Sequence, residues 1–130
     1  MQLTTEVAAS RRVLVVEDHE DGRRMLCSLL RLWGHQVEEA GDGPEGVRKA
    51  LDWKPEVAVV DIGLPKLDGY EVARLLKAAL DGGVVVIALT AYGGPEDVRR
   101  AFEAGFDAHL TKPADLYELS RLVASASPLA

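Results

Sequence analysis

Two short apolar runs that end in acidic residues constrain this chain more than any other feature. Residues 13–16 lead into Glu17 and Asp18, and residues 57–60 lead into Asp61. If both runs form neighbouring parallel strands, the three carboxylates meet at the C-terminal edge of one sheet, where open α/β folds place their functional sites. Carboxylates held about 4 Å apart repel each other by roughly 4 kcal/mol per pair in an effective dielectric near 20. The sequence therefore predicts a bound cation at this edge, and Mg²⁺ is the natural candidate.

The rest of the chain alternates between apolar runs and segments with helical periodicity, separated by Gly and Pro. The expected strands are residues 13–16, 35–40, 57–61, 84–89 and 106–110, and the expected helices are residues 25–33, 47–53, 70–76, 95–102 and 115–124. This alternation predicts an α/β, flavodoxin-like (βα)5 fold with a doubly wound parallel five-stranded sheet in the order 2-1-3-4-5. That order makes the first and third strands neighbours. It also brings Thr90 and Lys112, which follow the fourth and fifth strands, to the edge that holds the three acids.

Composition predicts a single domain in a chain of 130 residues. We expect a flexible tail or linker over residues 1–10, the domain over residues 11–125 and a C-terminal tail over residues 126–130. The net charge of −6, with scattered basic residues, argues against a nucleic-acid partner. No apolar stretch approaches the roughly 20 residues of a membrane helix, and the single cysteine, Cys27, excludes an internal disulfide and suits a core position. These features predict a cytoplasmic domain without a membrane segment.

Four short motifs follow one another along the chain. They are Val-Val-Glu-Asp at 15–18, Asp-Ile-Gly-Leu-Pro at 61–65 with Asp-Gly at 68–69, Thr-Ala at 90–91 and Lys-Pro at 112–113. Together they resemble the receiver domain of two-component response regulators, over residues 11–124. The resemblance implies a phosphoacceptor in a phosphorelay, in which Asp61 takes a phosphoryl group from a phosphohistidine of a sensor histidine kinase or phosphotransfer domain and the domain then switches partner binding. Such a domain is a signalling phosphoacceptor that catalyses only its own phosphorylation and dephosphorylation, and no other enzyme activity is expected.

The same resemblance assigns the metal ligands. It implies that Asp18, Asp61 and the backbone carbonyl of Gly63 bind Mg²⁺ directly, with Mn²⁺ as a substitute, and that Glu17 acts through water. The chemistry agrees with this assignment. A carboxylate is a weak nucleophile toward an anionic phosphorus, so the site has to neutralise charge and align the attack.

Further residues of the resemblance contact the phosphoryl group or report its presence. Thr90 and Lys112 would contact the phosphoryl oxygens, and Pro113 is a candidate for a cis peptide bond after the lysine. The family often has Tyr or Phe three residues before the lysine, where this chain has His109. Thr90 and His109 are thus the expected switch residues, which would act on a downstream protein through the face formed by the fourth helix, fifth strand and fifth helix. An ordinary strand histidine is the alternative at position 109.

Residues 61–65 and 108–113 look most like receivers attached to hybrid sensor histidine kinases. The chain is therefore expected either to act alone by binding a partner or to be a piece of a hybrid kinase. The main alternative function is a phosphorylation-independent (degenerate) receiver that acts as a protein-binding module.

Two other classes of protein on related folds fit less well. A dehalogenase-like phosphatase needs a second acid at position 63, which is Gly. A flavin or nucleotide module needs a phosphate-binding loop after the first strand, where Glu20 and Asp21 would repel a phosphate.

Overall fold

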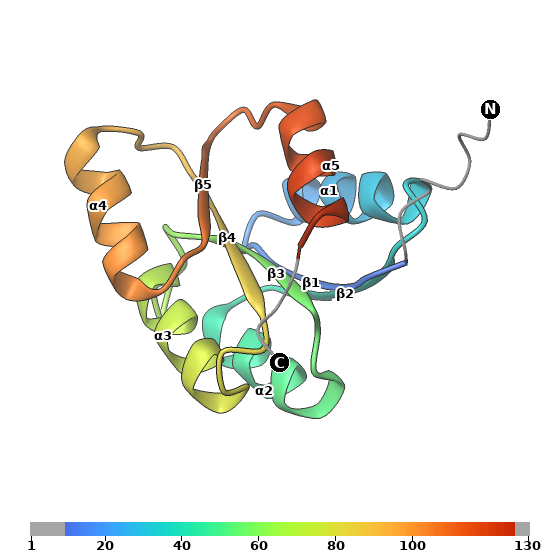
Figure 1. Cartoon of the computed structure of the whole chain (residues 1–130), viewed down its shortest axis with the longest axis horizontal. Coiled ribbons are helices and arrows are strands. Elements are labelled where there is room, and N and C mark those ends of the chain that lie inside the picture. The colour runs from blue at the N-terminus through green and yellow to red at the C-terminus, as the bar shows by residue number, and fades with distance from the viewer. Residues whose placement is uncertain (1–9, 127–130) are drawn as a thin grey trace.

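The computed structural model describes residues 10–126, which form one five-stranded sheet between two layers of helices (Figure 1). All strand pairs are parallel and the order is β2-β1-β3-β4-β5, which confirms the predicted fold class. The strands are β1 (Arg12–Val16), β2 (Gln36–Ala40), β3 (Val57–Asp61), β4 (Val85–Thr90) and β5 (Ala108–Thr111). The helices are α1 (Glu20–Leu32), α2 (Gly43–Trp53), α3 (Gly69–Ala79), α4 (Pro95–Ala104) and α5 (Leu116–Ala124). Apart from Ser10 and Ala126, the two predicted tails lie outside the described residues.

The central strands are buried on both faces, and this is why their sequences are apolar without alternation. One face of β1, β3 and β4 packs against α2, α3 and α4, and the other face packs against α1 and α5 (Figure 1). Cys27 of α1 lies fully buried in the second of these layers. Burial raises the pKa of its thiol to about 11, so Cys27 is an unreactive core residue, as expected. No helix within residues 10–126 is long and apolar enough to cross a membrane.

Aspartates begin three of the five helices. Asp42 and Asp68, each followed by a glycine, accept bonds from the backbone N–H groups of Glu45 at 2.9 Å and Glu71 at 3.0 Å. Asp115 caps α5 in the same way. These three acids therefore satisfy helix ends and belong to the scaffold.

Helix α1 begins earlier than the apolar periodicity predicts. It starts at Glu20, with His19 as the N-cap, whereas the sequence indicated a helix from residue 25. Glu20 and Asp21 occupy the first turn, where their charges interact favourably with the helix dipole. The loop that follows β1 is consequently short, and the residues after Asp18 turn directly into α1.

His35 is a buried histidine that lies just before β2 and forms a hydrogen bond with the backbone just before β1. It is 7% exposed, and its Nδ1 accepts a hydrogen bond from the backbone N–H of Arg11 at 3.1 Å. The Arg11 guanidinium donates to the carbonyl of Ala124 at 2.8 Å and lies 3.8 Å from Glu56. Burial, together with the charge of Arg11, holds the pKa of His35 below its usual 6.5, against the opposing charge of Glu56.

We expect the free energy of unfolding to fall as the pH drops through the range just below 6.5. In this range the unfolded chain is protonated at His35 to a greater extent than the folded chain, because the pKa of His35 is lower in the folded state, so acid favours unfolding. Urea unfolding between about pH 7 and pH 5.5 should show this loss in the wild type and a smaller one in His35→Gln. An identical pH dependence in the two proteins would contradict the role given to His35.

Candidate functional site

The three predicted acids lie together at the C-terminal edge of the sheet. Strands β1 and β3 pair with Val16 opposite Val60, so the residues that follow them leave the sheet side by side. One carboxylate oxygen from each of Glu17, Asp18 and Asp61 lies within 4.8 Å of the others. The sheet order changes direction between β1 and β3, and this is where an open α/β sheet forms a binding crevice.

Glu17 is the most buried of the three acids, with 6% of its surface exposed. Its two carboxylate oxygens accept hydrogen bonds from Lys112 Nζ at 3.0 Å and from the backbone N–H of His19 at 3.1 Å. Burial raises the pKa of Glu17 and the nearby charge of Asp61 adds to this, while the bonds from Lys112 and His19 oppose it. The cluster brings three carboxyl groups together with one lysine, Lys112.

Asp61 does not cap the helix that follows it. Helix α3 begins eight residues later and is capped by Asp68. The Oδ1 atom of Asp61 accepts a hydrogen bond from the backbone N–H of Gly63 at 3.1 Å, and Oδ2 lies 3.4 Å from Lys112 Nζ. One carboxylate oxygen is thus oriented by the following loop, and the other faces the ammonium group.

Lys112 reaches the acids from the end of β5. Its ammonium group has two acidic partners, with Glu17 at 3.0 Å closer than Asp61 at 3.4 Å. Burial alone would lower the pKa of Lys112, but the hydrogen bond with Glu17 and the charge of Asp61 outweigh it and raise the pKa. The backbone N–H of Lys112 donates to the Thr90 carbonyl at 2.7 Å, and the Lys112–Pro113 peptide bond, the predicted cis candidate, is cis.

Thr90 lies at the same edge and is 2% exposed. Its Oγ1 accepts a hydrogen bond from the backbone N–H of Tyr92 at 3.0 Å. Because Oγ1 acts as an acceptor in this bond, its own O–H proton stays available for another group. His109 stands opposite Ala88 on the neighbouring strand, and its buried Nε2 has no hydrogen-bond partner within residues 10–126. The structure therefore shows no bond between His109 and the rest of the site.

Two residues that support the site were not given a role from the sequence. His19 donates its backbone N–H to Glu17 and caps α1. Gly69 packs against the backbone beneath Asp61, where a Cβ atom would come within 2.5 Å of Ile62 Cα and 2.6 Å of the Asp61 carbonyl oxygen. The Asp-Gly pair at the start of α3 was the available signal for this close approach, since glycine is placed where backbones must meet.

An apolar groove of about 420 Å³ adjoins the acidic cluster. Its walls come from α1, including Met25 and Leu29, and from the segment after β5, including Pro113 and Leu116. Glu17 and Lys112 also line it, so the groove is continuous with the acidic cluster. Met25 and Leu116 are 66% and 49% exposed, unusually high for large apolar side chains.

Comparisons with known proteins agree with this geometry. The family model described as response regulator receiver domain matches residues 13–124. The chain is 42% identical over 111 residues to the transcriptional regulatory protein PrrA of Mycobacterium leprae, covering 85% of this chain and 47% of that protein. It is 40% identical over 112 residues to the gliding motility regulatory protein of Myxococcus xanthus, covering 85% of this chain and 14% of that protein. The chain thus spans about half or less of the length of these curated relatives.

A solved structure supports the same comparison at the level of the fold. The chemotaxis protein CheY4 of Vibrio cholerae matches with a TM-score of 0.83 and 26% sequence identity, covering 92% of this chain and 100% of that one. The shared region therefore includes both the sheet and the edge at which the acids lie.

Proposed function

Because the chain belongs to the family of response regulator receiver domains, we propose that Asp61 accepts a phosphoryl group in a two-component phosphorelay. The supporting observation is the convergence of charges at one sheet edge. Asp61 shares a cluster of carboxylate oxygens within 4.8 Å with Glu17 and Asp18, and its Oδ2 lies 3.4 Å from Lys112 Nζ. Perturbed and clustered charges of this kind gather at functional sites.

In the proposed reaction, Asp61 attacks the phosphorus of a phosphohistidine on a sensor histidine kinase or phosphotransfer domain. The new O–P bond forms as the P–N bond breaks, and the leaving imidazole keeps the electron pair and takes a proton from solvent. Lys112 Nζ and Thr90 Oγ1 then donate hydrogen bonds to phosphoryl oxygens. Since Lys112 is bonded to Glu17 before transfer, it has to exchange partners. Such an exchange gives the domain two states that a second protein can distinguish.

The donor set fits a hard divalent cation. Asp18, Asp61 and the carbonyl of Gly63 would bind Mg²⁺ directly, Glu17 would act through water, and Mn²⁺ could substitute because it prefers the same oxygen ligands. Gly63 leaves this part of the site open, since a Cβ there would meet nothing nearer than Asp61 Oδ1 at 3.9 Å. When bound, the ion would neutralise charge between the carboxylates and the incoming phosphoryl group.

The apolar groove beside the acidic cluster supports a proposal for the phosphodonor partner. A kinase or phosphotransfer helix that buries apolar side chains in this groove would bring its phosphohistidine to Asp61, because the groove itself is lined by Glu17 and Lys112. A downstream protein would use the other predicted face, where Phe102 of α4 and Tyr117 of α5 are 49% and 76% exposed. Attachment to a hybrid kinase, a cytoplasmic location and the absence of a nucleic-acid surface stay predictions.

The direct test is the intact mass of the wild-type protein after incubation with a small phosphoryl donor such as acetyl phosphate. We expect the gain of one phosphoryl group with Mg²⁺ and none with a chelator, because the metal and Lys112 supply the charge that the attack requires. Circular dichroism under both conditions controls for folding. No gain by a folded, Mg²⁺-bound protein would favour the phosphorylation-independent binding module.

Mg²⁺ should also stabilise the fold in the absence of any donor. Binding relieves the repulsion among the three acids, and at a hundredfold excess over the dissociation constant it should add about 2.7 kcal/mol to the free energy of unfolding. Urea unfolding with and without Mg²⁺ measures this gain. Asp18→Asn should lose most of it, whereas Asp42→Asn, at an acid that caps α2, should keep it. A gain that survives Asp18→Asn would place the metal elsewhere.

A further inference from the structure

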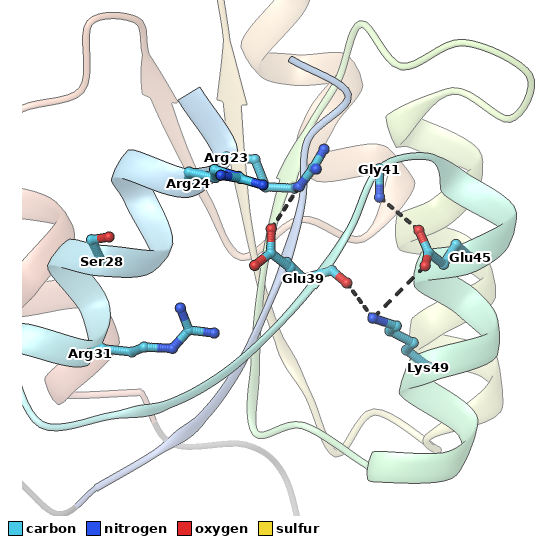
Figure 2. A pocket seen from close by; sticks show the side chains of 8 residues that line it. All are labelled: Arg23, Arg24, Ser28, Arg31, Glu39, Gly41, Glu45 and Lys49. Carbon is cyan, nitrogen blue, oxygen red and sulfur yellow. Dashed lines mark hydrogen bonds and ion pairs between the residues drawn. The ribbon is translucent and has the colours of Figure 1, made fainter. Parts of the chain in front are cut away.

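A basic pocket of about 470 Å³ lies between α1 and α2, over the exposed edge of β2 (Figure 2). Arg23, Arg24 and Arg31 approach it from α1, and Lys49 approaches it from α2. This volume lies in the range of small-molecule sites. The pocket is separate from the groove beside Asp61, and neither the fold nor the proposed phosphoryl transfer explains it.

Basic side chains gather at this pocket on a protein whose net charge is −6. Four cations and two carboxylates, Glu39 and Glu45, line it, and two further carboxylates, Glu20 and Glu38, pair with two of these cations from outside the lining. The other lining residues are Ser28 and Gly41, so no aromatic or aliphatic side chain is available to bind an apolar group. A ligand recognised here has to be recognised by negative charge and hydrogen-bond acceptors.

Two of the four cations already form hydrogen bonds with other groups of the protein. Arg23 donates to Glu39 at 2.8 Å and to the carbonyl of Glu17 at 3.0 Å. Lys49 donates to the carbonyl of Glu39 at 2.6 Å and lies 3.8 Å from Glu45 (Figure 2). These contacts hold β2 against both helices and give the pocket fixed walls, which lowers the ordering cost of binding.

Arg24 and Arg31 keep most of their donors for a ligand. Arg24 pairs with Glu20 at 2.9 Å, but both side chains are more than half exposed, and such a surface pair is weak enough for an anion to replace. Arg31 uses one nitrogen to bond the carbonyl of Val37 at 3.1 Å. Four residues after Arg24 and three before Arg31, Ser28 places a hydroxyl between them on the same face of α1.

We propose that this pocket binds the phosphate chain of a small molecule, with Arg24 and Arg31 as its two clamps and Ser28 as a donor between them. The two arginines are seven residues apart, roughly 10.5 Å along the helix axis. Long side chains at this spacing can reach successive phosphates of one chain, and guanidinium groups bind phosphate oxygens in pairs. A single phosphate would contact only one of the two arginines and would bind more weakly.

The test is a titration of the ¹⁵N-labelled protein with tripolyphosphate in buffer without Mg²⁺, followed by amide chemical shifts and by calorimetry. We expect saturable binding with shifts at Arg24, Ser28 and Arg31, and weaker binding of inorganic phosphate. Arg24→Gln/Arg31→Gln should weaken tripolyphosphate binding at least about tenfold. Arg99→Gln/Arg121→Gln removes the same charge from α4 and α5 and should change it less than about twofold. Arg24→Gln alone, at a side chain 70% exposed, gives a second test if the double variant unfolds.

Several outcomes would overturn the proposal. They are the absence of saturable binding, equal weakening by both double variants, and shifts confined to the residues around Lys112 and Thr90. ATP provides a further comparison. Equal affinity for ATP and tripolyphosphate would assign recognition to the phosphate chain alone, and tighter binding of ATP would assign the site to a nucleotide.

Discussion

Asp61→Asn should yield a folded protein that takes up no phosphoryl group. An amide oxygen is not a usable nucleophile toward phosphorus, so the loss should be complete. The fold should tolerate the change, because the asparagine Oδ1 can still accept the bond from Gly63 that Asp61 accepts at 3.1 Å. Without Mg²⁺ the variant should be at least as stable as the wild type, since one of three clustered charges is gone and Lys112 keeps its 3.0 Å bond to Glu17.

Intact mass after incubation with acetyl phosphate and Mg²⁺ measures the effect, and Asp68→Asn is the matched control. Asp68 lies seven residues further along the same segment and caps α3, and asparagine caps a helix as well as aspartate does. The control should therefore gain one phosphoryl group like the wild type. If Asp61→Asn still gained a phosphoryl group, peptide mapping would identify another acceptor, and Asp18 would be the first candidate.

The fold could be predicted because its central strands leave few alternatives. Runs such as residues 57–60 are buried on both faces, so they lack the alternation of a surface strand and indicate a parallel sheet covered by helices. With the strand order known, the positions of Glu17, Asp18 and Asp61 follow, since each lies at the C-terminal end of a strand or within two residues of it. The site was therefore predictable as a set of residues that share one edge.

Element ends were less predictable because they depend on packing between distant parts of the chain. The fifth strand was expected from residue 106 but begins at Ala108. Phe106 is instead part of the core, where its ring meets that of Tyr70 edge to face at 6.5 Å between centroids. The sequence does not distinguish an apolar residue that pairs with the neighbouring strand from one that precedes the strand and packs into the core.

Side-chain partners were the least predictable feature. That Lys112 lies nearer to Glu17 than to Asp61 depends on rotamers at the ends of two strands 95 residues apart in sequence. The basic pocket was difficult to predict for the same reason, because it also depends on contacts between distant segments. Arg24, Ser28 and Arg31 share a helical spacing that the sequence reveals, but Lys49 joins them only because α2 packs on the other side of β2.

Gly69→Ala should destabilise the protein by about 2 kcal/mol, near the upper end of the overpacking range after the helix-propensity offset, and weaken the proposed metal site as well. A Cβ at this position would lie 2.5 Å from Ile62 Cα and 2.6 Å from the Asp61 carbonyl oxygen. Both are backbone atoms, so neither can rotate away, and overpacking of this kind typically costs about 1–3 kcal/mol. Alanine's higher helix propensity offsets at most about 1 kcal/mol. The hydrogen bond from Gly69 N–H to the Ile62 carbonyl, now 3.0 Å, would lengthen as the loop shifts.

Gly63→Ala is the matched control, because it adds the same methyl group to the same loop where only Asp61 Oδ1, at 3.9 Å, lies near. Its free energy of unfolding should stay within about 1 kcal/mol of the wild type. Urea unfolding with and without Mg²⁺ separates two effects in Gly69→Ala, the clash itself and the displacement of Asp61. If the clash alone operated, the variant would lose stability but gain as much from Mg²⁺ as the wild type does. Because Ile62 directly follows Asp61, we expect the Mg²⁺ gain to shrink too, and an unchanged gain would show that the position of Asp61 does not depend on Gly69.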